Sequence, residues 1–258
     1  MRKIVSFSGG FDSTLALIQT LTTSSEYDEI ICLSVYHKLT GISKLDKERE
    51  ARKKIIDYLT EKYSKMNLQT YELEVDLKWE SDNYGNNRGL SQPIFWICNI
   101  APFISDEDTV ILGYIKDDQA PAKIESMKRM WNAAMEIQND KLTKIEFPLL
   151  MHSKSEVIKD LLRLDPEVVE MCFSCESLGR DSSVCGRCEP CNHLKSALVS
   201  LIVYEPQSIA DKARELLKSK FDLEIEVKYP IYDKEVATES TETDLIEDST
   251  SDDSDYKG

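Results

Sequence analysis

Hydrophobic and polar positions along the chain follow two alternating patterns. Short apolar, β-branched runs predict buried strands, and longer stretches with apolar residues every three or four positions predict helices. The predicted strands cover residues 3–7, 30–36, 68–75, 109–113 and 145–149. The predicted helices cover residues 15–21, 45–66, 93–104 and 122–138, one that begins at Ser153, and two between 194 and 220. This order predicts an α/β fold with a doubly wound parallel sheet.

Several side chains in these elements are predicted to pack inside the molecule. Trp96 and Phe103 are expected in the core, and Ser153 with Glu156 has the spacing of a helix capping box. The helix over 122–138 carries a stripe typical of a core or a protein interface: Met127, Met130, Trp131 and Met135. The mixed-charge run over residues 44–54 predicts a solvated helix face with i,i+4 ion pairs.

A parallel sheet binds its ligand outside the carboxyl ends of the strands. The turn after the first strand, the end of the second at Tyr36 and His37, and Gly113 at the end of the fourth would open onto this edge. His37 is a candidate to contact a ligand at this edge, but a histidine at a strand end is more often only packed. Residues 76–89 form a long loop, a length that is often functional.

A glycine-rich turn joins the first predicted strand to the first predicted helix. It consists of Ser8, Gly9, Gly10, Phe11, Asp12, Ser13 and Thr14. Backbone N–H groups at a helix N-terminus favour an anion, glycines allow close approach, and hydroxyls can donate to phosphate oxygens. Asp12 would repel phosphate unless it holds Mg2+ or orients the turn. Neither the Gly-Lys-Ser/Thr nor the Gly-x-Gly-x-x-Gly pattern occurs here, and a plain capped turn is the alternative.

Cysteines are concentrated in one short segment. Five of the seven lie within residues 172–191: Cys172, Cys175, Cys185, Cys188 and Cys191. Zinc accepts four thiolates, and Cys-x2-Cys turns place two of them on one metal ion. Disulfides are the alternative, disfavoured by the odd cysteine count, the spacing and the lack of an apolar secretory segment. A four-thiolate site needs four of these five cysteines, so one of them is not a ligand. His193 is an alternative ligand, although a lone histidine at such a position more often lies at the surface.

With both motifs in view, the chain resembles the 7-cyano-7-deazaguanine synthase (QueC) family of PP-loop N-type ATP pyrophosphatases. That family combines a Ser-Gly-Gly-x-Asp-Ser-Thr loop with a Ser/Thr-Cys…Cys-Gly-x-Cys-x-x-Cys zinc knuckle, which match Ser8–Thr14 and residues 174–191. Between them the match is looser. Residues 109–113 resemble a strand ending in glycine, Asp118 falls at an acidic position, and residues 147–156 resemble a Pro-Leu…Lys-x-Glu segment.

The resemblance implies a reaction and roles for individual residues. ATP would be cleaved between its α- and β-phosphates to adenylate 7-carboxy-7-deazaguanine. Ammonia would displace AMP to give an amide, and a second adenylation would dehydrate the amide to the nitrile, 7-cyano-7-deazaguanine (preQ0). The implied catalytic residues are Ser8, Asp12 and Ser13. The residues implied to bind ATP and Mg2+ are Ser8, Gly9, Gly10, Phe11, Asp12, Ser13, Thr14, Tyr36, Gly113 and Lys154. Asp118 would contact the base, and Cys175, Cys185, Cys188 and Cys191 would hold a structural Zn2+ ion, with Cys172 spare.

Two segments depart from the family pattern. A Pro-Gly-Arg-Asn stretch is replaced by residues 90–96, and a Tyr-Pro-Asp-Cys-Arg segment that helps build the base pocket is replaced near residues 120–123. ATP use is therefore better supported than the identity of the acceptor. One alternative is a paralogue that adenylates or amidates another carboxylate, or that stops at the amide. Another is a nucleotide-binding regulator that does not turn ATP over.

The composition of the chain supports predictions about its segments, its partners and its location. The chain has 258 residues, 41% of them hydrophobic, and a net charge of −15. Three segments are expected: an ATP pyrophosphatase domain over 1–168, a knuckle with helices over 169–232, and a disordered acidic tail over 233–258. Strong phosphate binding needs clustered Lys and Arg, so direct nucleic-acid binding is not expected. We expect a cytoplasmic protein that acts on a small-molecule substrate and ammonia and has no membrane partner. The sequence is also compatible with a homodimer.

Overall fold

The computed structural model describes most of the chain. The described residues are 1–37, 42–75, 92–105, 107–118, 121–139, 143–179 and 183–226. The loop predicted over residues 76–89 and the acidic tail predicted over residues 233–258 lie outside them.

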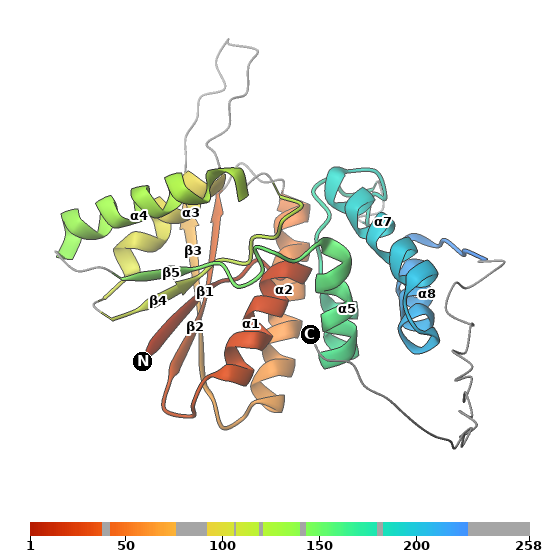
Figure 1. Ribbon diagram of the computed structural model, residues 1–258, viewed down its shortest axis with the longest axis horizontal. Helices are drawn as coiled ribbons and strands as arrows, with labels where there is room; N and C mark the ends of the chain where they lie inside the picture. Colours follow the sequence, from red (N-terminus) through yellow and green to blue (C-terminus); the bar gives the residue numbers. More distant parts are fainter. Residues whose placement is uncertain are drawn as a thin grey trace, which may run out of the picture.

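Five strands form one parallel sheet (Figure 1). They are β1 (Arg2–Ser6), β2 (Glu29–His37), β3 (Asn67–Val75), β4 (Thr109–Ile111) and β5 (Lys144–Glu146). The order is β3-β2-β1-β4-β5, and every pairing is parallel. The chain moves outward from β1 to β3 and then returns to the other side of β1, so the order reverses between β1 and β4. Connections that diverge at such a point leave a crevice at the carboxyl ends of the strands.

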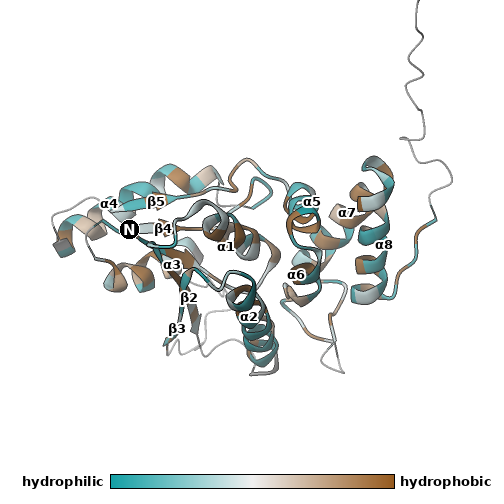
Figure 2. Ribbon diagram, turned by 90° about the horizontal axis from the view of Figure 1, so that it is seen from below, coloured by the Kyte–Doolittle hydropathy of each residue, from teal (hydrophilic) through white to brown (hydrophobic). Residues whose placement is uncertain are grey.

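Helices cover both faces of this sheet (Figures 1 and 2). Helices α1 (Phe11–Thr23), α2 (Ile42–Lys62) and α5 (Lys154–Leu164) share one hydrophobic cluster, and α3 (Gln92–Ile100) and α4 (Ile124–Asn139) share the other. Neighbouring strand residues alternate between the clusters, as Ile4 and Val5 do, because side chains on a strand point to opposite faces. The predicted doubly wound α/β fold is confirmed.

The face of α4 that carries the methionine stripe packs against the sheet. Met127, Trp131 and Met135 are buried, and Met130 packs beside them. Trp96 is also partly buried against this cluster. Phe103 was expected in the core, and this was wrong, because its side chain is 43% exposed. The α-helix ends at Ile100 and continues as the tighter 3-10 turn η1 (Ala101–Phe103), which changes the direction of the side chains that follow.

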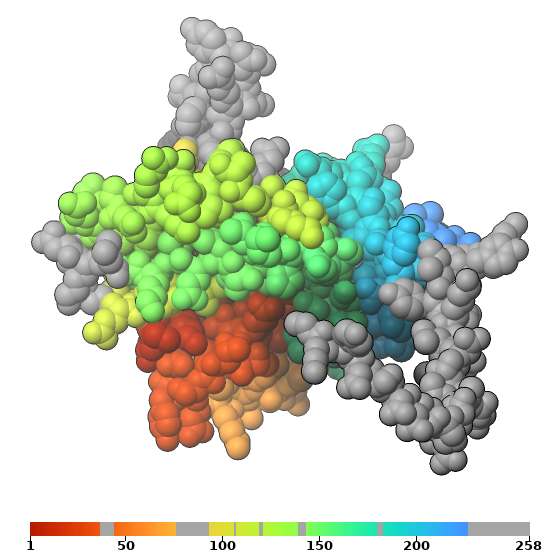
Figure 3. Space-filling model, in the orientation of Figure 1, coloured from red at the N-terminus to blue at the C-terminus, as the bar shows by residue number. Residues whose placement is uncertain are grey.

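The C-terminal helices extend the same core. They are α6 (Pro166–Met171), α7 (Glu189–Tyr204) and α8 (Gln207–Phe221). The cyan and blue part of the chain lies against the green part that contains α5 (Figure 3). Asp165, fully buried, accepts hydrogen bonds from Tyr58 Oη and Lys62 Nζ at 2.8 Å each, which ties the start of α6 to α2. The boundary at residue 168 stays a prediction. Among the described residues, no helix has the length and apolar content needed to cross a membrane.

The predicted capping box at the start of α5 is present. Ser153 Oγ accepts from the backbone N–H of Glu156, and Glu156 Oε2 accepts from the backbone N–H of Ser153 at 2.7 Å. The hydrogen bonds from Ser153, with a smaller contribution from Lys116, lower the pKa of Glu156 to about 2. The cap fixes the direction in which α5 leaves the sheet edge, and with it the position of Lys154.

Candidate functional site

The turn between β1 and α1 lies at the carboxyl edge of the sheet, where the strand order reverses. Gly9 has a φ of +78°, a conformation that favours glycine. A Cβ atom on Gly9 would lie 2.9 Å from Arg52 Cγ, so α2 packs directly against the turn. At the end of β4, a Cβ atom on Gly113 would lie 3.0 Å from the carbonyl oxygen of Asp12. Both glycines therefore allow backbone to approach the first turn of α1 closely.

Hydroxyl groups hold this turn in one conformation. Ser8 Oγ and Ser13 Oγ are 3.0 Å apart, and Ser13 Oγ also accepts from the backbone N–H of Ser8 at 3.2 Å. Thr14 is buried, and its hydroxyl donates to the carbonyl oxygen of Gly10 at 2.7 Å. Phe11 is buried in the core. Ser8 and the half-buried Gly10 therefore form the accessible part of the turn, and Ser13, Thr14 and Phe11 support it.

Lys154 lies across the turn and binds Asp12. Its Nζ is 2.8 Å from Asp12 Oδ1 and 2.7 Å from Oδ2, and its backbone N–H donates to Asp117 Oδ2 at 2.7 Å. The ion pair neutralises the carboxylate that would otherwise repel a phosphate on this turn. Two residues 142 positions apart in the sequence thus meet at one site, because α1 and α5 both begin at the carboxyl edge.

Asp118 follows β4 on the same edge. Its Oδ2 accepts from the backbone N–H of Ile115 at 2.9 Å. Surrounding protein raises the pKa of Asp118 by removing water from it, and the negative charge of Asp12 raises it further, whereas the hydrogen bond from Ile115 and the charge of Lys154 lower it. The predicted base-binding residue therefore lies within electrostatic reach of the Asp12–Lys154 pair.

Tyr36 lies at the end of β2 and is buried. The guanidinium carbons of Arg52 and Arg49 lie 4.3 and 4.8 Å from the centre of its ring. Burial, together with the nearby Glu72 carboxylate, raises the pKa of Tyr36 to about 12. Its ring is thus held by two cations beside the turn. His37 is the last residue of β2, but its side chain lies outside the described part of the structure.

The sequence reasoning missed three residues at this edge. Within the described ranges, the buried side-chain nitrogen and oxygen atoms without a hydrogen-bond partner are Tyr36 Oη, Arg52 Nε, Arg52 Nη2, Tyr114 Oη and His152 Nδ1. Tyr114 directly follows Gly113, and His152 comes two residues before Lys154, so their sequence positions could have marked them. Buried polar atoms are normally hydrogen-bonded, and of these unpartnered groups Tyr36 and Arg52 lie in contact with each other beside the turn.

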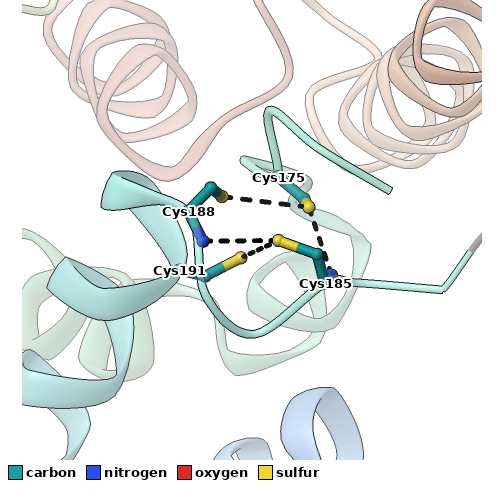
Figure 4. Close-up of side chains that lie close together, drawn as sticks. All are labelled: Cys175, Cys185, Cys188 and Cys191. Atoms are coloured by element: carbon teal, nitrogen blue, oxygen red, sulfur yellow. Dashed lines mark hydrogen bonds between the residues drawn. The ribbon is translucent and has the colours of Figure 1, made fainter. Parts of the chain in front are cut away.

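Four cysteines converge beside α7 (Figure 4). The sulfur atoms of Cys175, Cys185, Cys188 and Cys191 all lie within 4.8 Å of one another, and the Cys185–Cys191 and Cys175–Cys188 sulfur pairs are each 4.0 Å apart. Thiolates around a tetrahedral zinc ion with bonds of about 2.3 Å lie about 3.8 Å apart, whereas a disulfide bond measures about 2.0 Å. The four sulfurs therefore fit a metal site.

The fifth cysteine lies outside this group. The Sγ of Cys172 is buried and donates to the carbonyl oxygen of Val168 at 3.4 Å. Burial raises the pKa of Cys172 to about 12, so it remains a thiol. His193 is exposed on α7 and is not one of the grouped residues.

Backbone N–H groups prepare the cysteine cluster for a metal ion. Burial raises the pKa of Cys185, but hydrogen bonds from the N–H groups of Arg187 and Cys188 outweigh it and lower the value to about 6. Burial raises the pKa values of Cys175 and Cys191. Gly186 adopts a φ of +67°, which lets the chain turn sharply around the sulfurs. Four converging sulfurs are a donor set suited to a soft or borderline cation.

The cysteine cluster is also joined to the glycine-rich turn. The backbone N–H of Phe173 donates to the carbonyl oxygen of Gly9 at 3.0 Å. Phe173 lies two residues before Cys175, so the segment that enters the cluster is hydrogen-bonded to the turn at its left-handed glycine.

Residues 107–201 match the family model described as queuosine biosynthesis protein QueC. The predicted resemblance to the QueC family is confirmed. The matched segment includes Gly113, Asp118, Lys154 and the cysteine cluster, and the turn over residues 8–14 precedes it. QueC-like PP-loop proteins are enzymes that use ATP, and the turn and the cysteine cluster lie together here as that family combines them.

One solved structure with a similar chain is the U34-tRNA thiolase NcsA from Methanococcus maripaludis with its [4Fe-4S] cluster. The two chains are 16% identical, with a TM-score of 0.43, and the match covers 89% of this chain and 75% of that chain. No curated protein sequence matches the chain.

Proposed function

We propose that the chain binds ATP on the turn over residues 8–14 and cleaves it between the α- and β-phosphates to adenylate a carboxylate. The observation that carries this proposal is the position of the turn at the reversal of strand order, with Lys154 closing on Asp12 from the opposite side. The QueC match supports a 7-deazaguanine-type acceptor. The proposed acceptor is 7-carboxy-7-deazaguanine, and the proposed product is preQ0.

The residues of the turn would act mainly on the leaving group. An oxygen of the acceptor carboxylate attacks the α-phosphorus, the bond to the bridging oxygen breaks, and pyrophosphate leaves with that bonding pair. Ser8 and the N–H groups at the start of α1 would donate hydrogen bonds to pyrophosphate, Ser13 would hold Ser8 in place, and Lys154 would add positive charge. Asp12 would orient Lys154. Mg2+ bound beside the phosphates would neutralise their charge, and Asp12 is the carboxylate of the turn that would hold it.

Ammonia completes the proposed reaction. It attacks the adenylated carboxyl carbon, and AMP leaves with its oxygen to give an amide. Adenylation of the amide oxygen by a second ATP and loss of AMP then give the nitrile. Two ATP molecules are consumed for each nitrile formed.

The metal ion proposed for the cysteine cluster is Zn2+. Cys175, Cys185, Cys188 and Cys191 would hold it, and four thiolates leave no open position for a substrate. Its proposed role is structural.

The test is to incubate the protein with ATP, Mg2+, ammonium and 7-carboxy-7-deazaguanine and to weigh the products. We expect preQ0 with two AMP and two pyrophosphate molecules for each molecule formed. An accumulating amide would make the chain an amidating relative, an alternative favoured by the altered segment near residues 120–123, where η2 (Pro121–Lys123) lies. ATP binding without any AMP would contradict the proposal and favour a nucleotide-binding regulator.

Asp118 is proposed to accept hydrogen bonds from the guanine-like edge of the base. Asp118→Asn replaces one acceptor oxygen with a donor group, so we expect it to raise the KM for the base by about tenfold or more, the effect of losing roughly 1.4 kcal/mol. The KM for ATP should change less than twofold. Steady-state kinetics with each substrate varied would measure both. Equal effects on the two KM values would remove Asp118 from the base pocket.

A further inference from the structure

Arg52 is buried although it carries a full positive charge. Its side chain lies on α2 and is 5% exposed. Within the part of the chain that the structure describes, its Nε and Nη2 atoms have no hydrogen-bond partner. A buried guanidinium normally uses its donors, because leaving them unpaired after removal from water is costly.

Its neighbours hold the guanidinium in place without using these donors. The Tyr36 ring lies on one side, with its centre 4.3 Å from the guanidinium carbon. Arg52 Nη1 donates to the carbonyl oxygen of Ser8 at 3.4 Å, a long hydrogen bond. The Oε1 atom of Glu72 lies 3.9 Å from Nε, beyond hydrogen-bond distance. Arg52 is thus fixed by stacking and by the turn, and two of its nitrogens remain available.

The position of Arg52 connects these nitrogens to the turn. A Cβ atom on Gly9 would lie 2.9 Å from Arg52 Cγ and 3.3 Å from its backbone nitrogen, so only a glycine lets α2 approach this closely. The guanidinium then reaches Ser8, the exposed hydroxyl residue of the turn. The buried cation therefore adjoins the N-terminus of α1, a helix of 13 residues whose dipole favours the same ligand charge.

We propose that Arg52 is a further anion-binding residue of this site and that its free N–H groups bind the pyrophosphate portion of the nucleotide. The planar guanidinium can donate two parallel hydrogen bonds to phosphate oxygens, which a lysine ammonium cannot reproduce. Tyr36 Oη, which is also buried and has no partner among the described residues, is a second donor next to Arg52. This assignment rests on the proposed function, because it takes the turn over residues 8–14 as the phosphate site.

Arg49 provides a matched control on the same helix. It too lies against the Tyr36 ring, at 4.8 Å, but its side chain is exposed. Its guanidinium nitrogens face the carboxylates of Glu72 and Glu74 at 3.9 and 3.7 Å. A substitution of Arg49 therefore changes a nearby cationic group while leaving the Arg52 guanidinium in place.

The experiment measures binding of inorganic pyrophosphate with Mg2+ by calorimetry, with Mg2+ alone as the blank. Arg52→Lys should weaken binding at least about tenfold, because the bidentate geometry is lost while the charge is kept. Arg49→Lys should change it less than twofold. NMR of the chain labelled with 15N-arginine gives one Nε–H signal for each arginine. The signal that is missing from Arg52→Lys belongs to Arg52, and in the wild-type chain it should shift when pyrophosphate is added.

The outcomes separate this inference from the proposed function. Wild-type affinity in a folded Arg52→Lys chain, or an Arg52 signal that pyrophosphate does not shift, would overturn it. Absence of pyrophosphate binding by the wild-type chain would overturn it as well. If Arg52→Lys does not fold, substitution of each of the other arginines identifies their Nε–H signals, and the signal that remains belongs to Arg52. Whether pyrophosphate shifts that signal in the wild-type chain then decides the proposal. Pyrophosphate binding with the Arg52 shift but no AMP formation would leave the anion site standing and contradict only the proposed chemistry.

Discussion

Replacement of Asp12 by alanine is expected to reduce AMP and pyrophosphate formation by about a hundredfold or more while the chain stays folded. Asp12 holds Lys154 by both carboxylate oxygens, so its loss leaves that cation without the contact that places it over the turn. Ser13→Ala should act in the same direction, because Ser13 Oγ ties the turn together through Ser8. Quantification of AMP by chromatography, with circular dichroism to check folding, measures the effect.

The control is Glu125→Ala. Glu125 forms an exposed ion pair with Lys128 on α4, so its removal deletes an acid–lysine contact outside the turn over residues 8–14. AMP formation should stay within about twofold of the wild-type rate, because exposed pairs contribute little. Wild-type activity in Asp12→Ala would show that the turn is not the ATP site.

The second large effect is expected at the cysteine cluster. The purified protein should carry about one zinc ion per chain, the stoichiometry of a single four-thiolate site. Serine at Cys185, Cys188 or Cys191 should abolish metal binding, and the unfolding temperature should fall because metal binding and folding are coupled. A loss of ~1 kcal/mol shifts the midpoint of a chain of this size by roughly 2–4 °C, so a fall of about 10 °C or more is expected. Metal analysis and thermal unfolding measure the two effects.

Two other cysteines serve as controls for this series. Cys98 is exposed on α3, and Cys172 is buried outside the cluster. Cys98→Ser and Cys172→Ser should both keep the metal ion. Loss of the metal in Cys172→Ser, combined with its retention in Cys175→Ser, would replace Cys175 by Cys172 as the fourth ligand.

The parts of the fold that follow from local pattern could be predicted from the sequence. Apolar runs mark the buried strands. Glycines mark the turn, because they adopt backbone conformations that other residues rarely adopt. The spacing of the cysteines likewise implies sulfurs that converge. In each case residues close together in the sequence determine the local structure. Long-range contacts determine only where that structure lies in the fold.

Arg52 could not be predicted in this way. It lies in the mixed-charge run over residues 44–54, and that run does form exposed i,i+4 pairs, such as Lys44–Glu48 and Lys54–Glu50. The local sequence does not distinguish Arg52, which is buried, from the exposed charged residues beside it. The difference arises only when α2 packs against Gly9, 43 residues earlier in the chain. Phe103 was misplaced for a related reason, because the point at which α3 tightens into η1 depends on packing as well as on the apolar pattern.

The hydrogen bond from Phe173 N–H to the Gly9 carbonyl has a consequence for engineering. A fragment that ends before residue 173 would keep every strand of the sheet but would lose the donor that meets Gly9 beside the proposed phosphate site. A chimera that imports a knuckle from another protein would need to reproduce the backbone path over residues 172–175 as well as the four cysteines. The two motifs, although they lie more than 150 residues apart in the sequence, are joined by this hydrogen bond and would have to be exchanged together.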